Sequence, residues 1–239
     1  MGILQKILKK AEQWAVFNHK APNNYNEEKL KTLDNIASSI TCGSVLLCSG
    51  TAAESRLIEE VDQTDFSHAA MIIKFHKKNE LYVWTADTVD IMDDQIKKEK
   101  NLKHAGTHLL KLKDYIANLD KLYPSPDGSK YRFAVARLKG VIANEKKLWE
   151  IMYEYDGTPF PPTSEELLHW LAGQFDIDTG MDNSFCAQMV ARTYQEMGWL
   201  SAENPANHYN PGLFAITEQI NKELTGGAQL EEPEYFKLK

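Results

Sequence analysis

The stretch from Asn183 to Gly198 most constrains the fold, because it predicts a helix with a cysteine in its first turn. Ser184, Asp182 or Asn183 can accept hydrogen bonds from the first free backbone N–H groups, and Gly198 is placed to end the helix in a left-handed conformation. A spacing of three and four residues places one set of side chains on a single helical face: Cys186, Val190, Thr193, Tyr194 and Met197. The cysteine is therefore expected to point toward the body of the protein.

Cys186 has two interpretations at this stage. A thiol in the first turn of a helix lies at the positive end of the helix dipole, which favours the nucleophilic thiolate. A cysteine is also a small, often buried residue that fills a core. A nucleophilic role requires a base for the thiol and a third group that orients the base.

Histidine and two polar residues on a predicted hairpin can supply those groups. Residues 66–75 read as a strand with His68 near its start, and residues 81–87 read as a second strand after a charged turn. Alternation of side chains places Thr85 and Asp87 on one face of the second strand, where either can face His68. Taken alone, a histidine such as His68 is more often a structural residue than a catalytic one.

The remaining pattern predicts an α+β fold, with strands mostly in the first part of the chain and helices after them. Further strands are expected at 43–50, 107–112, 131–138 and 235–238. Further helices are expected at 29–40, 53–61 and 113–119. Two more should begin after the N-caps Asn144 and Thr163. Residues 213–224 are expected to form either a helix or extended chain.

Charge and cysteine content limit the partners and the compartment. The net charge is −7, and the lysines and arginines are interspersed with acids, so nucleic acid is not an expected partner. Three cysteines are an odd number and do not form a disulfide framework. With no long apolar run, we expect a cytoplasmic protein.

The N-terminal region is predicted to be a helical segment, residues 1–42, ahead of a main domain over 43–239. Residues 1–20 form a basic amphipathic helix that either covers the domain or contacts an anionic membrane surface, and we favour the covering role.

No metal or cofactor is expected from the sequence. His104 and His108 are separated by three residues, as in some zinc sites, but no cysteine pair or carboxylate is placed to complete the ligands.

Several of these motifs, in this order, resemble the permuted branch of the NlpC-like papain-fold superfamily. The similarity is to its YiiX-like members and, more distantly, to lecithin retinol acyltransferase. It spans about residues 43–200 and is carried by Gly43-Ser44-Val45-Leu46-Leu47, Phe66-Ser67-His68-Ala69-Ala70-Met71, Leu81-Tyr82-Val83-Trp84-Thr85 and Phe185-Cys186-Ala187-Gln188-Met189-Val190-Ala191.

The resemblance implies a circularly permuted papain-like antiparallel sheet with packed helices. It implies a cysteine hydrolase or acyltransferase with Cys186 as nucleophile, His68 as general base and Thr85 at the third position. The implied substrate is a peptide or a lipid-like acyl compound, cleaved at an amide, ester or thioester. Two positions differ from the family, which usually has aspartate at Ser44 and glutamate or histidine at Thr85. A catalytically inactive lipid- or protein-binding module on the same fold is the alternative.

Overall fold

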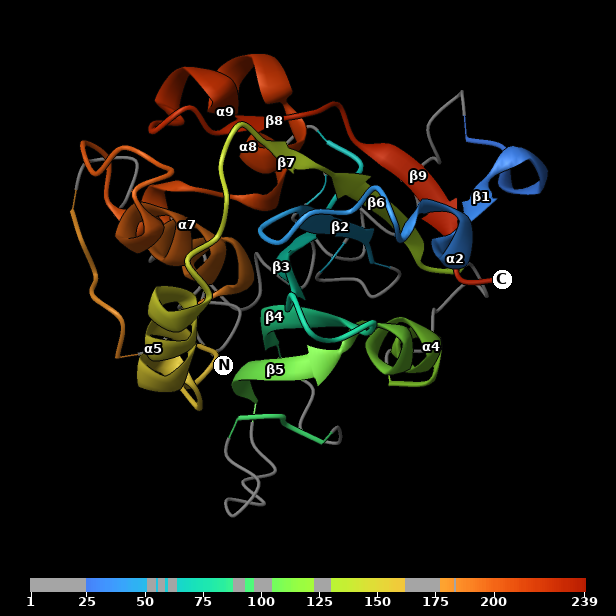
Figure 1. Ribbon diagram of the computed structural model, residues 1–239, viewed down its shortest axis with the longest axis horizontal. Helices are drawn as coiled ribbons and strands as arrows, with labels where there is room; N and C mark the ends of the chain where they lie inside the picture. Colours follow the sequence, from blue (N-terminus) through green and yellow to red (C-terminus); the bar gives the residue numbers. More distant parts are fainter. Residues whose placement is uncertain are drawn as a thin grey trace, which may run out of the picture.

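The computed structural model describes residues 25–50, 55, 59, 64–87, 93–96, 105–122, 130–161, 177–182 and 184–239. Within them the chain forms a seven-stranded sheet in the order β1-β9-β6-β2-β3-β4-β5 (Figure 1). The pairings are antiparallel except that of β1 with β9. The expected α+β class and antiparallel sheet are confirmed. The predicted helix after Thr163, most of the helix at 53–61 and residues 1–24 lie outside the described residues.

The centre of the sheet follows the strands predicted from the sequence. Its members are β2 (Val45–Ser49), β3 (His68–Lys74), β4 (Leu81–Asp87), β5 (Gly106–Lys111) and β6 (Arg132–Ala136). The expected hairpin is present, with Met71 opposite Trp84 and Lys74 opposite Leu81. The strands were predicted correctly because β-branched, aromatic and alanine side chains fill both faces of the sheet.

Each face of the sheet is covered by a different set of helices. Val45, Met71 and Trp84 belong to one core cluster together with residues of α5 (Glu145–Tyr155) and α7 (Cys186–Met197). Their neighbours along the strands belong to a second cluster, with α2 (Leu33–Ile36) and α4 (Leu112–Leu122). Figure 1 shows α5 and α7 on one side of the sheet and α2 and α4 on the other.

The cysteine helix begins and ends as predicted, but its N-terminal cap is different. Cys186 is its first residue, and Gly198 follows its last turn with a φ of 78° in the left-handed region. The N-cap is Phe185, which gives no side-chain cap. Ser184 does not cap the helix, because it is buried beside Thr107, with the two hydroxyl oxygens 3.4 Å apart.

The N-terminal part of the described chain joins the same sheet and core. The helix expected over 29–40 is shorter, because the 3-10 turn η1 (Glu27–Lys29) and strand β1 (Lys31–Thr32) precede α2. Thr32 and Asn35 form a capping box that starts α2 at Leu33. β1 runs parallel to β9 (Glu234–Lys237), the strand predicted near the C-terminus.

Short elements complete the C-terminal third of the chain. The region expected as helix or extended chain contains α8 (Pro211–Ala215), capped by the Asn210 side chain, and α9 (Thr217–Glu223). The 3-10 turn η2 (Ala206–His208) comes before them, and β7 (Leu138–Lys139) pairs with β8 (Gln229–Leu230).

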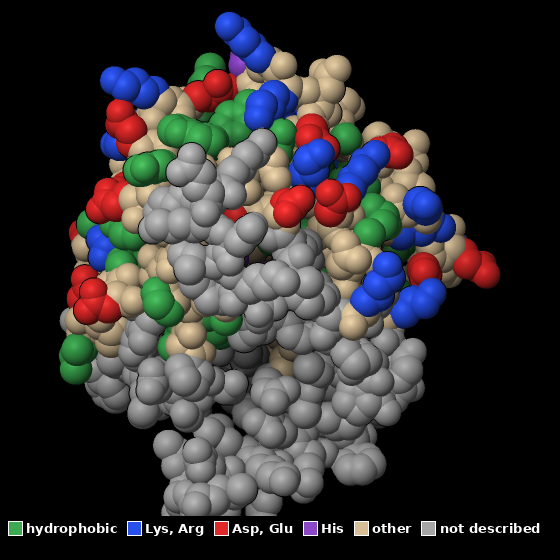
Figure 2. Space-filling model, turned by 90° about the horizontal axis from the view of Figure 1, so that it is seen from below, with side chains coloured by type: hydrophobic (Ala, Val, Ile, Leu, Met, Phe, Trp, Pro, Cys, Tyr) green, Lys and Arg blue, Asp and Glu red, His purple; other side chains and the backbone are tan. Residues whose placement is uncertain are grey.

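The described surface is mixed in charge. Figure 2 shows acidic and basic side chains interspersed over the described part of the face seen from below. None of the helices in the described ranges is long and apolar enough to cross a bilayer.

A buried hydrogen bond ties α7 to the start of β2 and gives a stability prediction. The Tyr194 hydroxyl is fully buried and donates to the carbonyl oxygen of Gly43. Tyr194→Phe should lower the free energy of unfolding by about 1–3 kcal/mol, because the carbonyl loses its donor away from water. Urea denaturation measures this change. Tyr153→Phe, at a side chain that is 57% exposed, is the control and should stay within about 0.5 kcal/mol of the wild type. Equal losses in both variants would contradict the prediction.

Candidate functional site

The polar side chains predicted on the hairpin lie together at one end of the sheet. His68 is the first residue of β3, and Asp87 is the last residue of β4. The His68 Nε2 atom is 2.8 Å from the Thr85 hydroxyl oxygen and 3.9 Å from a carboxylate oxygen of Asp87. The structure thus places both candidate orienting residues around the same imidazole nitrogen.

Tyr115 completes this group and was not predicted from the sequence. It lies on α4, and its hydroxyl is 3.2 Å from His68 Nε2 and donates to Asp87 Oδ2 at 2.6 Å. The side chain is 1% exposed, so these contacts are shielded from water. Its position on a predicted helix was visible in the sequence, but nothing local indicated that this helix would cover the face that carries His68.

The hydrogen bonds assign the proton on the imidazole. A tyrosine hydroxyl has one proton, and Tyr115 gives it to Asp87, so toward His68 it can only accept. The proton between His68 Nε2 and Tyr115 therefore belongs to Nε2. In the neutral ring, Nδ1 is then the nitrogen with the free lone pair and is the one that can act as a base.

Burial and charge act on the His68 pKa in opposite directions. Burial lowers the pKa of His68 below the ordinary histidine value of about 6.5, and the Asp87 carboxylate raises it less than burial lowers it. The imidazole is therefore neutral at physiological pH. Because the folded pKa lies below the unfolded one, the contribution of His68 to stability is complete above about pH 6.5 and is lost as the pH falls toward the folded pKa.

Cys186 lies in the first turn of α7, at a different part of the core. It is 2% exposed and belongs to the apolar cluster on the α7 face of the sheet, with Met71 and Trp84. His68 shares the other face with Ala70 and Ile72, as its contact with Tyr115 shows. The sheet therefore separates the two side chains along most of its length, and they can approach each other only past its end.

Cys48 is the neighbour of His68 across the β2-β3 ladder. Burial raises the pKa of the Cys48 thiol well above its usual value, and the Asp87 carboxylate raises it further.

A second group of polar side chains could hold a metal ion. Asp94, His108 and Asp156 have candidate ligand atoms within 4.8 Å of one another. In the sequence, the spacing of His108 pairs it only with His104, and no carboxylate stands at a spacing in the chain that suggests a partner. Asp94 and Asp156 come from a charged loop and from a helix end, and the fold brings them to His108.

Comparisons with known proteins find similarity in structure at low sequence identity. No protein-family model matches the chain, and no curated protein matches its sequence. Among solved structures, it is similar to the crystal structure of the metalloprotein YiiX from Escherichia coli O157:H7, DUF1105. The two are 17% identical, the match covers 82% of this chain and 98% of that chain, and the TM-score is 0.46.

At this identity and TM-score the similarity assigns neither a permuted papain fold nor a reaction to the chain.

The opposing effects on His68 give a prediction for its titration. Asp87→Asn should lower the pKa of His68 further, because the carboxylate that favours the imidazolium is removed while the amide oxygen can still accept from Tyr115. NMR titration of the imidazole measures the shift. Glu218→Gln, which removes an exposed carboxylate on α9, is the matched control and should leave the His68 pKa unchanged. A rise in the pKa of the Asp87 variant would contradict the assigned role of this carboxylate.

Proposed function

We propose that the protein is a cysteine hydrolase or acyltransferase in which Cys186 attacks an acyl carbon and His68 acts as base. The observation that supports this most is the imidazole held through Nε2 by Thr85 and Tyr115, which leaves Nδ1 as its basic nitrogen. A histidine whose tautomer is fixed in this way is the requirement for a thiol-histidine pair.

In this proposal, Thr85 and Asp87 both orient the His68 imidazole, each by a different contact. The Thr85 hydroxyl accepts the Nε2–H directly at 2.8 Å, whereas Asp87 acts through Tyr115 and through its charge at 3.9 Å. A threonine alone holds the ring but does not stabilise the imidazolium. The Asp87 carboxylate supplies that stabilisation, since it favours the charged ring.

The start of α7 supplies the second requirement of acyl transfer. Its first backbone N–H groups have no side-chain cap, so they and the helix dipole can stabilise a thiolate and the oxyanion of a tetrahedral intermediate. In the reaction, the sulfur bonds to the acyl carbon and the imidazolium protonates the leaving amine, alcohol or thiol. Water or a second acceptor, deprotonated by the imidazole, then releases the acyl group.

The proposed substrates are peptides or lipid-like acyl compounds, at an amide, ester or thioester bond. Cys186 is nearly buried and lies on the face of the sheet opposite that of His68. The proposal therefore requires the two side chains to meet at the end of the sheet, and this end to open for the substrate. A catalytically silent binding module on the same fold would keep the buried polar group without turnover.

The reactivity of Cys186 tests the proposal against the binding module. At about pH 6.5, two units below the pKa of an unperturbed thiol, we expect iodoacetamide to modify Cys186 in the wild type and to do so more slowly in His68→Ala and His68→Gln. Burial raises the pKa of both Cys42 and Cys48, so these thiols are internal controls that should stay unmodified. Peptide mapping by mass spectrometry reports each site separately. Equal labelling of Cys186 in all three folded proteins would reject the thiol-histidine pair.

Turnover of acyl ester and peptide libraries gives the second test. Cys186→Ala should abolish turnover, and His68→Gln should lower kcat/KM by about 10²–10⁴. Thr85→Val keeps the shape of the side chain and removes one hydrogen bond, so a loss of about tenfold is expected. Turnover that survives Cys186→Ala would place the chemistry elsewhere.

A further inference from the structure

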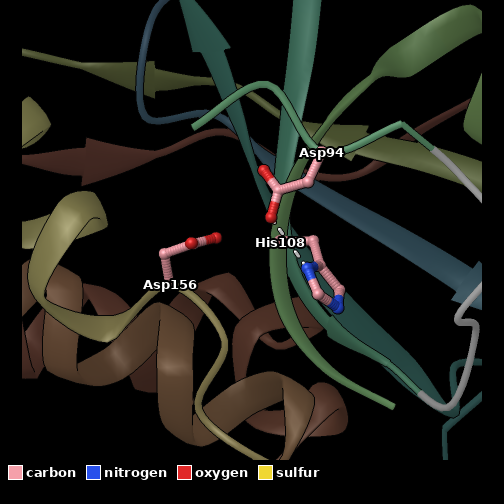
Figure 3. A group of neighbouring side chains, drawn as sticks. All are labelled: Asp94, His108 and Asp156. Carbon is pink, nitrogen blue, oxygen red and sulfur yellow. Dashed lines mark hydrogen bonds and ion pairs between the residues drawn. The ribbon is translucent and has the colours of Figure 1, made fainter. Parts of the chain in front are cut away.

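Three ionisable side chains converge at the outer edge of β5. His108 comes from the middle of β5, Asp94 from the segment 93–96, and Asp156 from the residue that ends α5. Figure 3 shows the Asp156 carboxylate pointing toward Asp94 and His108. His108 Nδ1 lies 2.9 Å from Asp94 Oδ2, and the ligand atoms of all three residues lie within 4.8 Å of one another.

Backbone hydrogen bonds hold these three segments in place independently of the side chains. Gln95 N–H donates to the Leu109 carbonyl at 2.8 Å, on one side of His108. On the other side, Gly157 N–H donates to the Thr107 carbonyl at 2.8 Å, and Thr107 N–H donates to the Thr158 carbonyl at 2.9 Å. The two carboxylates are thus brought to the imidazole by strand-like pairing along the edge of β5, which preorganises the group.

The group brings two carboxylates close together where little water reaches them. The side chains of His108 and Asp94 are 9% and 15% exposed, and Asp156 is 8% exposed. Asp156 contacts Asp94, and its carboxylate points toward Asp94 and His108. Two carboxylates facing each other with so little water repel unless a proton or a cation lies between them.

We propose that Asp94, His108 and Asp156 bind a divalent transition-metal ion, with Zn²⁺ as the ion that best fits their donors. One imidazole nitrogen and two carboxylate oxygens are the donor types of zinc sites, whereas Mg²⁺ and Ca²⁺ prefer oxygen donors alone. Two carboxylates and a neutral imidazole balance the charge of a dication.

The spacing of the donors agrees with this assignment. Ligands bound at about 2.1 Å to one ion lie about 3.0–3.4 Å apart, close to the 2.9 Å between His108 Nδ1 and Asp94 Oδ2. Binding replaces this hydrogen bond, since Nδ1 releases its proton to solvent and coordinates the ion. The Asp156 carboxylate approaches from within 4.8 Å to complete the three protein ligands.

The bound ion fastens the segment 93–96 and the end of α5 to β5. His108 is also the residue directly opposite Thr85 across the β4-β5 ladder. The ion therefore stabilises the strand next to the one that holds Thr85 against His68. This role does not depend on the proposed cysteine chemistry.

Zinc binding by the full chain, stripped of metal with a chelator, tests the assignment. Equilibrium dialysis with elemental analysis should find one Zn²⁺ per wild-type chain, and saturating Zn²⁺ at about 100 times Kd should raise Tm by about 5–10 °C. Mg²⁺ at the same concentration should give a much smaller rise. Asp156→Asn, which preserves shape, should lose the bound Zn²⁺ and the rise in Tm, as should His108→Ala.

Three comparisons make the result decisive. Asp93→Asn removes the exposed carboxylate beside Asp94 and should bind Zn²⁺ as the wild type does. Cys186→Ala should also bind normally, which separates this site from a thiolate that captures zinc. In chelator, Asp156→Asn should be at least as stable as the wild type, because it removes a repelling charge. No bound Zn²⁺ in the wild type, normal binding by Asp156→Asn, or loss of binding in Cys186→Ala would each overturn the proposal.

Discussion

The alternation of side chains along β3 and β4 is the constraint on which the rest of the structure depends. Both faces of the central strands are buried, so each residue is committed to one of two cores. A slip of one residue in β3 would send His68 to the α7 face and put an alanine beside Tyr115. The register of one hairpin therefore decides which helix supplies the partners of the imidazole.

Much of the fold was predictable because its signals are local. The hairpin of β3 and β4, the Asn144 cap of α5 and the left-handed end of α7 at Gly198 all follow from short patterns. The neighbourhood of His68 and Thr85 was also predictable, since it needs only two paired strands and their alternation.

The rest depended on packing between distant segments, which a local pattern does not contain. Tyr115 reaches His68 from a helix 47 positions away in the chain, and that contact depends on which face of the sheet α4 covers. The cap of α7 was wrong for a similar reason, because Ser184 packs against Thr107 of a distant strand. Asp156 meets His108 only because the chain after α5 returns to the edge of β5.

The buried polar group at the end of the sheet combines rigidity with burial. His68, Thr85, Asp87 and Tyr115 bond to one another within an apolar core, and such a network holds one geometry because any other arrangement leaves a buried polar atom unsatisfied. Asp87 and Tyr115 thus fix the orientation of the imidazole as part of the packed core. The thiol on the opposite face depends on a different set of packing contacts.

The chain segments that cover β5 also have a consequence for the behaviour of the protein in a crowded cell. β5 is the last strand of the sheet, and an uncovered last strand offers a row of free N–H and C=O groups to any passing polypeptide. Residues 95 and 157–159 occupy these groups from Gly106 to Leu109. The molecule thereby blocks the addition of a foreign strand, and with it the edge-to-edge aggregation to which open sheets are prone.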